Sequence, residues 1–244
     1  MFDIYKIFFI DIETVPQTAT LSELSEELQN LWADKFYQLQ RRTPDKYGEN
    51  TTAEEGYLKN AGIYSEFGRI ICISIGFIAQ RQGKKVFRIK SFAEDDEKTL
   101  LQKFSELIVN SFKIAEYNFC GHNIKEFDIP YICRRMLVNG LQLPEPLQIN
   151  AKKPWEVNLL DTLDYWKFGD YKNYVSLKLL TAIFEIPTPK DDINGSMVAE
   201  VYYHEKNLER IVTYCQKDVF ATAQVWLKMN GLAMLDSENV EYVE

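Results

Sequence analysis

Apolar and polar positions along the first hundred residues predict three strands. Residues 4–10 are mostly β-branched or aromatic, which is typical of a strand that is buried on both faces. Two further stretches of this kind, 69–78 and 85–92, flank a short polar turn at 81–84. Strands joined in this way usually pair with their neighbours in sequence, so we expect a three-stranded meander.

Later in the chain, strand and helix patterns alternate. Further strands are expected at 114–120 and 157–160. Apolar residues recur at three- and four-residue steps in six expected helices. The long ones are 21–41, a helix that begins after Asp95 or Asp96 and has its inner face at 100–108, and 207–229. The shorter ones are a helix from Asp128 to 137, a helix at 177–183 and a helix near Val198 and Val201. This order favours an α/β fold with a five-stranded sheet flanked by helices.

The segment between the first two strands, residues 17–66, interrupts this order. Its first half has helical periodicity, whereas residues 43–62 are polar, are punctuated by glycine and are expected to form a loop. We interpret 17–66 as a helical insertion within a single domain that spans 1–230. The insertion either drapes over a functional site or is a plain surface excursion, and both readings stay open. Residues 231–244 form an acidic tail that we expect to be frayed from Asp236 onward.

The composition is that of an ordinary globular protein. The 244 residues suffice for one domain with a substantial core, and 46% of them are hydrophobic and 26% charged. No apolar run approaches the ~18 residues that a membrane-spanning helix requires, and the N-terminus does not have the pattern of an export signal. The four cysteines are widely spaced among mostly apolar neighbours, so we expect free thiols in a reducing cytoplasm rather than a zinc site.

The formal net charge of −8 does not favour tight binding of long duplexes. It leaves short or single-stranded nucleic acid open, because an enzyme that holds phosphates through metal ions needs acids at its centre. The position of the acids is therefore more informative than their number.

Several acids lie at the ends of otherwise apolar elements. Asp11 and Glu13 end the first strand, and residues two apart in a strand share one face. Two acids side by side near an apolar strand repel each other unless a cation lies between them. Asp128 begins an apolar helix, where it could simply be an N-cap, and Asp218 lies on the apolar stripe of the last helix. Carboxylate ligands without histidine or cysteine suit Mg²⁺ or Mn²⁺.

Three motifs carry a family resemblance. They are Phe9-Ile10-Asp11-Ile12-Glu13-Thr14, Asn123-x-x-x-Phe127-Asp128 and Tyr214-x-x-x-Asp218. In order and spacing they resemble the three motifs of the DEDD 3′–5′ exonucleases, and the chain is similar to stand-alone predicted exonucleases related to the proofreading domain of family-B DNA polymerases. The histidine branch has His five residues before the last acid, where this chain has Thr213, whereas Tyr214 matches the tyrosine branch. The resemblance covers most of residues 1–230.

The resemblance implies a ribonuclease H-like mixed sheet and a two-metal site. Asp11, Glu13, Asp128 and Asp218 would hold two Mg²⁺ or Mn²⁺ ions, and the Tyr214 hydroxyl would orient the attacking water. Because the unperturbed pKa of tyrosine is near ~10, Tyr214 is expected to position the water rather than to act as a base.

The neighbouring polar residues have less defined roles. Thr14 and Asn123 are candidates for holding the terminal nucleotide, and His122 is expected to be structural. The similar exonucleases also have an aspartate at the position of Asp161. Either contact with the substrate or a structural role at the end of a strand would explain this aspartate.

The implied activity is the release of nucleoside monophosphates from the 3′ ends of single-stranded DNA. Two alternatives stay open: a 3′–5′ exoribonuclease acting on short RNA, and a catalytically silent nucleic-acid-binding module of the same fold. The residue that would sense a 2′-hydroxyl is not identifiable in the sequence. A polymerase or repair partner would fit this activity, and the sequence does not identify one.

Overall fold

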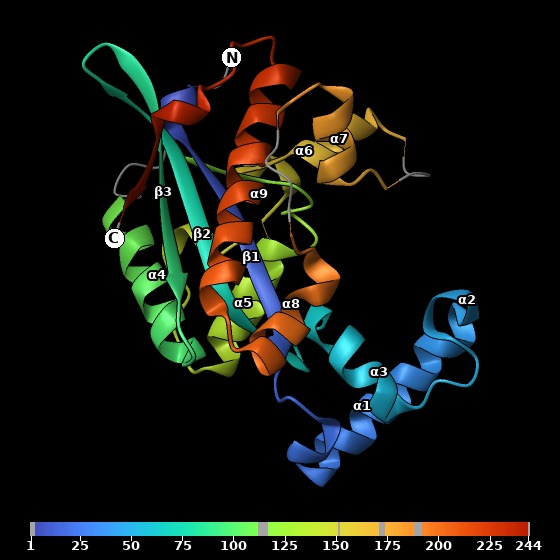
Figure 1. Ribbon diagram of the computed structural model, residues 1–244. Coiled ribbons are helices and arrows are strands. Elements are labelled where there is room, and N and C mark those ends of the chain that lie inside the picture. The colour runs from blue at the N-terminus through green and yellow to red at the C-terminus, as the bar shows by residue number, and fades with distance from the viewer. Residues whose placement is uncertain (1–2, 112–116, 151, 171–173, 188–191, 244) are drawn as a thin grey trace.

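A mixed sheet forms the centre of the molecule (Figure 1). The computed structural model describes residues 3–111, 117–150, 152–170, 174–187 and 192–243. The strands of this sheet are β1 (Ile7–Pro16), β2 (Gly68–Arg81), β3 (Lys84–Ala93), β4 (Asn118–Gly121), β5 (Leu159–Asp161) and β6 (Val240–Val243). Their order is β5-β4-β1-β2-β3-β6.

The pairing of the strands confirms the expected α/β class. Strands β1, β2 and β3 are antiparallel neighbours and form the expected meander, whereas β4 runs parallel to β1 and β5 parallel to β4. The expected start of the fourth strand at residue 114 lies outside the described residues. The sheet has six strands rather than the expected five.

The sixth strand comes from the acidic tail. Val240–Val243 pairs in parallel with β3, so that Phe87 lies opposite Val240. The carboxylate of Glu241 lies 3.3 Å from the guanidinium groups of both Arg81 and Arg88. This short strand covers backbone groups of β3 that would otherwise be left at the edge of the sheet. The expectation of a frayed tail is therefore wrong for these residues, because the tail's acid is matched to basic residues far away in the sequence.

Helices cover both faces of the sheet. Outside the insertion they are α4 (Glu97–Ser111), α5 (Asp128–Val138), α6 (Thr162–Lys167), α7 (Leu177–Ile183), α8 (Val198–Glu200), the π-helical turn Val201–Glu205 and α9 (Leu208–Met229). Side chains alternate along β1, so Phe8 and Ile10 pack against α4 and α5 whereas Ile7 and Phe9 pack against α9. Within the described ranges, none of the helices combines the length and apolar character that crossing a membrane requires.

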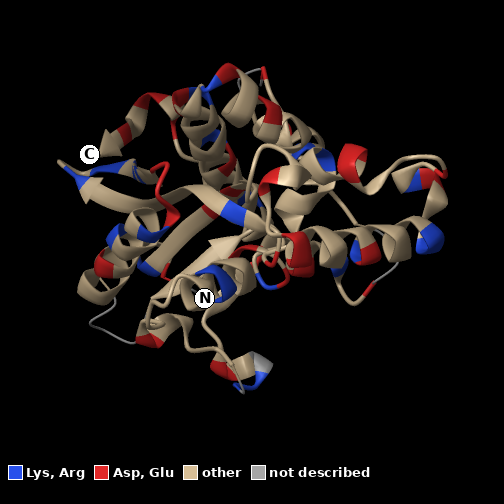
Figure 2. Ribbon diagram, turned by 90° about the horizontal axis from the view of Figure 1, so that it is seen from below, with Lys and Arg blue, Asp and Glu red and all other residues tan. Residues whose placement is uncertain are grey.

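The insertion forms a helical unit that projects from the sheet (Figure 1). Its helices are α1 (Glu26–Arg42), α2 (Pro44–Tyr47) and α3 (Ala53–Asn60), followed by the 3₁₀ turn Ala61–Ile63. Trp32, Phe36 and Tyr57 are buried together in an apolar cluster of their own, and Figure 2 shows acidic and basic positions interspersed along the helices. The division into a domain at 1–230 and a tail stays a prediction.

The expected loop at 43–62 is wrong, because most of this segment is helical. Thr52 and Glu55 form a reciprocal capping box that starts α3. The indole N–H of Trp32 donates a 2.8 Å hydrogen bond to the carbonyl of Ala53, and a Cβ atom at Gly56 would lie 2.1 Å from the ring of Phe36. Thr52 and Gly56, which suggested a loop, thus belong to a short helix. Thr52 caps it, and Gly56 allows its close contact with Phe36.

Candidate active site

Two acids of β1 face helix α9. Asp11 lies opposite Ser74 of β2, and Glu13 lies opposite Cys72. The register shifts between Glu13 and Thr14, and such bulges re-aim side chains next to functional sites. The thiol of Cys215 on α9 donates to the main-chain oxygen of Asp11 at 3.4 Å and lies 3.5 Å from its Oδ2. These contacts bring α9 directly over the two acids.

The third acid approaches from the other side of β1. Strand β4 pairs with β1 only as far as Phe9, so the later edge of β1 is not covered by β4. Asp128 is the first residue of α5 and is buried at this edge, where the backbone N–H groups of Asp128 itself and of Ile12 lower the pKa of its carboxyl group against the larger opposing effect of burial. The N-cap position is Phe127. Asp128 is therefore not a simple N-cap, because its carboxyl group lies near the strand that carries Asp11 and Glu13.

The fourth acid, Asp218, lies on α9 one turn after Tyr214, and burial and then the charge of Asp218 raise the pKa of the Tyr214 hydroxyl. The close approach of α9 to the sheet positions both residues. Gln216 donates a 2.9 Å hydrogen bond to the hydroxyl of Ser91 on β3. A Cβ atom at Gly76 would lie 2.9 Å from Val219, so only glycine leaves room for the helix there.

The acids raise one another's pKa values. Burial raises the pKa of Asp11 well above its ordinary value, and the charges of Glu13, Asp128 and Asp218 raise it further. Burial and then the charge of Asp218 do the same to Glu13. Burial raises the pKa of Asp128 to about 7. Strand β1, the start of α5 and the middle of α9 thus bring four carboxylates close enough for their charges to interact. A bound cation would relieve their repulsion.

Two of these acids and a thiol are close enough to share an ion. Among the described residues, the cluster of metal-capable side chains with ligand atoms within 4.8 Å of one another consists of Asp11, Glu13 and Cys215. Burial raises the pKa of the Cys215 thiol, so its S–H group donates to Asp11 and the carboxylates are the ligands that fit a hard divalent ion. Cys215 is not among the site residues expected from the sequence. Its position three residues before Asp218, on the same helical face, is the signal that could have found it.

Asp161 organises the loop that leads to Asp128. Its buried carboxylate accepts hydrogen bonds from the backbone N–H groups of Asn123 and Leu163, each at 2.9 Å, and of Lys125 at 3.1 Å. Asn123 has a positive φ of 65°, a conformation that asparagine tolerates well. The structure thus gives Asp161 a role at the end of β5, where it holds the turn before α5. It places Asn123 in this turn through its backbone, and the substrate role of Asn123 stays a prediction.

His122 uses both ring nitrogens within the protein. Nδ1 lies 2.9 Å from the hydroxyl of Thr162, and Nε2 lies 2.8 Å from the carbonyl oxygen of Val175. Burial lowers the pKa of this imidazole, which favours the neutral form. These contacts support a structural role for His122.

Residues 63–243 match a family described as predicted 3′–5′ exonucleases related to the exonuclease domain of PolB. The chain belongs to this family. The match covers well over half of the chain and includes Asp128, Tyr214 and Asp218, whereas Asp11 and Glu13 precede it. Among curated proteins, no match to the sequence is found.

The fold of this exonuclease-family chain is also found in a polymerase. A family B DNA polymerase from the hyperthermophilic archaeon Pyrobaculum calidifontis is similar in structure, with a TM-score of 0.54 and 13% sequence identity. The similarity covers 91% of this chain and 24% of the polymerase chain. The likeness concerns the fold alone, and it agrees with the mixed α/β sheet flanked by helices.

In this family member a pocket of about 240 Å³ opens beside Glu13. It is lined by Ile12, Glu13, Thr14, Pro16, Leu58, Lys59, Gly62, Ile63, Phe127, Gly195, Ser196 and Ala199. Thr14 is one of the residues of β1 that line this pocket, and it follows Glu13 directly. Thr14 thus lies between the acids and this pocket, which keeps it a candidate for substrate binding.

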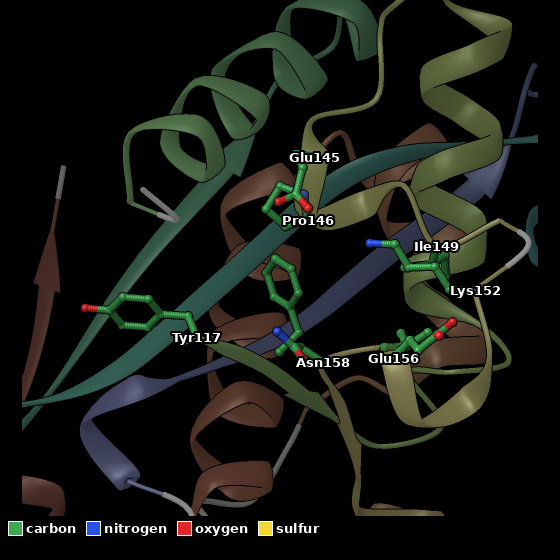
Figure 3. Close-up of a pocket in the computed structure, with 9 residues that line it drawn as sticks. Tyr117, Glu145, Pro146, Ile149, Lys152, Glu156 and Asn158 are labelled. Atoms are coloured by element: carbon green, nitrogen blue, oxygen red, sulfur yellow. The ribbon is translucent and has the colours of Figure 1, made fainter. Parts of the chain in front are cut away.

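A second pocket, of about 140 Å³, lies at the opposite end of the sheet (Figure 3). Tyr117 and Asn158, which line it, come just before β4 and β5, whereas the acids lie beyond the ends of these strands. This pocket is therefore separate from the candidate active site.

Proposed function

We propose that this chain is a metal-dependent 3′–5′ exonuclease of the tyrosine branch that removes nucleoside monophosphates from the 3′ ends of single-stranded DNA. The observation that carries the proposal is the convergence of four acids from three separate elements, with Tyr214 one turn before Asp218 and within the field of these acids. Carboxylates crowded in this way need neutralisation by protons or by cations.

In this proposal Asp11, Glu13, Asp128 and Asp218 hold two Mg²⁺ or Mn²⁺ ions. When bound, such ions would activate a water molecule and stabilise charge on the leaving oxygen of a phosphodiester. Burial and the neighbouring acids raise the pKa of Tyr214, so its hydroxyl keeps its proton at neutral pH. Tyr214 would therefore orient the attacking water as a hydrogen-bonding group instead of removing a proton from it.

Single-stranded DNA is the proposed substrate because the chain carries a net charge of −8, which disfavours extended contact with a duplex. A narrow pocket beside Glu13 suits one unpaired terminal nucleotide. The four cysteines are free thiols, which agrees with the proposed cytoplasmic location.

The test uses DNA and RNA oligomers of the same sequence, labelled at either end, with Mg²⁺ or Mn²⁺. We expect single-nucleotide shortening from the 3′ end of single-stranded DNA, and none from the Asp218→Ala variant. Asp164→Ala is the matched control, because this acid pairs with Lys125 on the surface. Faster shortening of RNA would assign the exoribonuclease alternative. Binding without cleavage by the metal-loaded wild type would assign the silent module, and full activity of Asp218→Ala would overturn the proposed site.

A further inference from the structure

The insertion reaches the active-site pocket described above. The last residues of α3 and the turn that follows contribute Leu58, Lys59, Gly62 and Ile63 to its wall, opposite Glu13. This end of the insertion therefore faces the acids directly, although the rest of the insertion projects away from the sheet (Figure 1).

Hydrogen bonds hold this end of the insertion in place. The hydroxyl of Tyr131 on α5 donates to the carbonyl of Gly62 at 2.7 Å, and the guanidinium group of Arg135 donates to the carbonyl of Ser65 at 2.9 Å. A Cβ atom at Gly62 would lie only 3.0 Å from the backbone of Val15 on β1. Such close backbone contact leaves the wall little freedom to move relative to the acids, so it is a built part of the pocket.

The chemistry of the wall suits a nucleotide strand. Leu58 and Ile63 offer apolar surface, and Phe127 contributes an aromatic ring to the same pocket. Among the described residues that line the pocket, Lys59 is the basic one, and it is exposed. Glu55, one turn before Lys59, uses its carboxylate to accept hydrogen bonds from Thr52 at 2.8 and 2.9 Å. The acids at the other end of the pocket repel phosphates, so an ammonium group here supplies the attraction that a strand needs.

We propose that the insertion is a substrate-binding element in which Lys59 contacts a backbone phosphate upstream of the scissile bond, while the terminal nucleoside occupies the pocket. This inference rests on the proposed function, which supplies the strand and its direction. It assigns to the insertion a role in affinity, and it leaves the chemical step to the acids and Tyr214. Loss of Lys59 should therefore weaken strand binding and raise KM without lowering kcat.

The experiment measures binding of a fluorescent single-stranded oligomer in Ca²⁺ at several salt concentrations. For Lys59→Ala we expect an affinity lower by about fivefold at low salt, and a slope of log affinity against log salt that is shallower by about 0.7, the value for one lost phosphate contact. Lys59→Arg should keep the wild-type slope. Lys46→Ala is the matched control, since Lys46 belongs to the same insertion but lies over the ring of Tyr47 and not in the pocket.

A kinetic arm separates this inference from the proposed function. A nucleoside 5′-(p-nitrophenyl phosphate) has one phosphodiester and no upstream phosphate, so the KM for it should differ less between wild type and Lys59→Ala than the KM for an oligomer, which should rise in the variant. Unchanged salt slope and unchanged KM in Lys59→Ala would overturn the role of Lys59 even if wild type is an exonuclease. A changed slope in a protein that never cleaves would keep the role of Lys59 and reject the exonuclease. Absence of oligomer binding by wild type would reject both.

Discussion

Asp218 lies one turn after Tyr214 on α9, and after burial its charge is the largest cause of the raised pKa of the Tyr214 hydroxyl. Asp218 in turn raises the pKa values of Asp11 and Glu13 on β1. A single pair of residues on one helix face thus links the tyrosine to the acids of the first strand.

Replacing Tyr214 by Phe removes this hydroxyl and leaves every proposed ligand in place. We expect kcat to fall by roughly 10²-fold, because the water is no longer oriented, while the Mn²⁺ concentration for half-maximal stabilisation stays unchanged. Because the pKa of the hydroxyl is raised above its ordinary value, the wild-type pH–rate profile should show no loss of activity from tyrosine ionisation near neutral pH. A Tyr214→Phe enzyme with wild-type kcat would remove the tyrosine from the mechanism.

Crowding of the acids predicts a metal-dependent melting temperature. A divalent ion that binds the folded state at a hundred times its Kd should stabilise the protein by about 2.7 kcal/mol, so millimolar Mn²⁺ should raise Tm. Glu13→Gln should raise Tm in EDTA, because one buried carboxylate is removed, and should abolish most of the Mn²⁺ effect. Asp164→Asn, a surface change, should leave both values unaltered. Equal Mn²⁺ shifts in Glu13→Gln and wild type would exclude Glu13 as a ligand.

Asp128 predicts a pH dependence of stability in the metal-free protein. Burial raises its pKa from 3.8 to about 7. Between these values the unfolded chain releases the proton and the folded chain keeps it. The contribution of Asp128 to the free energy of unfolding is therefore fully present at low pH and is lost as the pH rises through about 7. The free energy of unfolding of Asp128→Asn relative to wild type should therefore increase with pH over this window, by at most ~1.4 kcal/mol per pH unit. Urea titrations in EDTA would measure it, and a difference that does not change with pH would contradict the shift.

Much of this arrangement can be predicted from sequence, and the exceptions have physical reasons. Strands β2 and β3 are found where local pattern predicts them. Strand β1 begins at Ile7 and continues through Asp11 and Glu13 to Pro16, beyond its expected end, because it pairs with β2 along this whole length. Strand β6 is not recognisable from the sequence, because Val240–Val243 is only four residues long and contains Glu241. This segment forms a strand because β3 and its Arg88 lie beside it. Helix α3 is obscured by Gly56, which is required by a contact with Phe36 that the sequence does not reveal.

The candidate site likewise combines residues that the sequence reveals with contacts that it does not reveal. The four acids and Tyr214 lie in motifs of short spacing, which makes them visible in the sequence. The anchoring role of Asp161 depends on backbone amides some forty residues earlier in the chain. The proximity of Cys215 to Asp11, and of Lys59 to Glu13, depends on helix packing and on the return of the insertion to the sheet. Only the folded chain reveals contacts of this kind.

The hydrogen bonds of Asp161 predict that its substitution lowers both the stability of the protein and the activity of the site. Asparagine at this position keeps one acceptor oxygen, so at least one of the backbone N–H groups that bind Asp161 is left unsatisfied in a buried place. We expect Asp161→Asn to lower the free energy of unfolding by about 1–3 kcal/mol, and to lower kcat because the turn that positions Asp128 loosens. Urea unfolding with Asp164→Asn as the control measures the first effect. A stability change within ~0.5 kcal/mol, as for an ordinary surface substitution, would contradict the anchoring role.

The buried ion pair of Glu97 and Arg135 predicts a larger effect. Nη2 of Arg135 donates to Glu97 at 2.6 Å, and the same carboxylate accepts the backbone N–H of Ile70 at 2.7 Å. Removing one partner leaves a buried charge without its counter-ion, so Arg135→Met should lower the free energy of unfolding by about 3–5 kcal/mol. Combining it with Glu97→Leu should recover part of that loss, because no buried charge then remains.

Arg135 also lies two turns after Asp128 on α5 and binds the carbonyl of Ser65 at the end of the insertion. If this contact helps to hold the pocket wall in place, the double variant will recover stability but not the KM for an oligomer, since Ser65 still lacks its donor. A double-mutant cycle on unfolding, together with oligomer kinetics, separates the two contributions. Recovery of both stability and KM in the double variant would show that the contact with Ser65 plays no part in substrate binding.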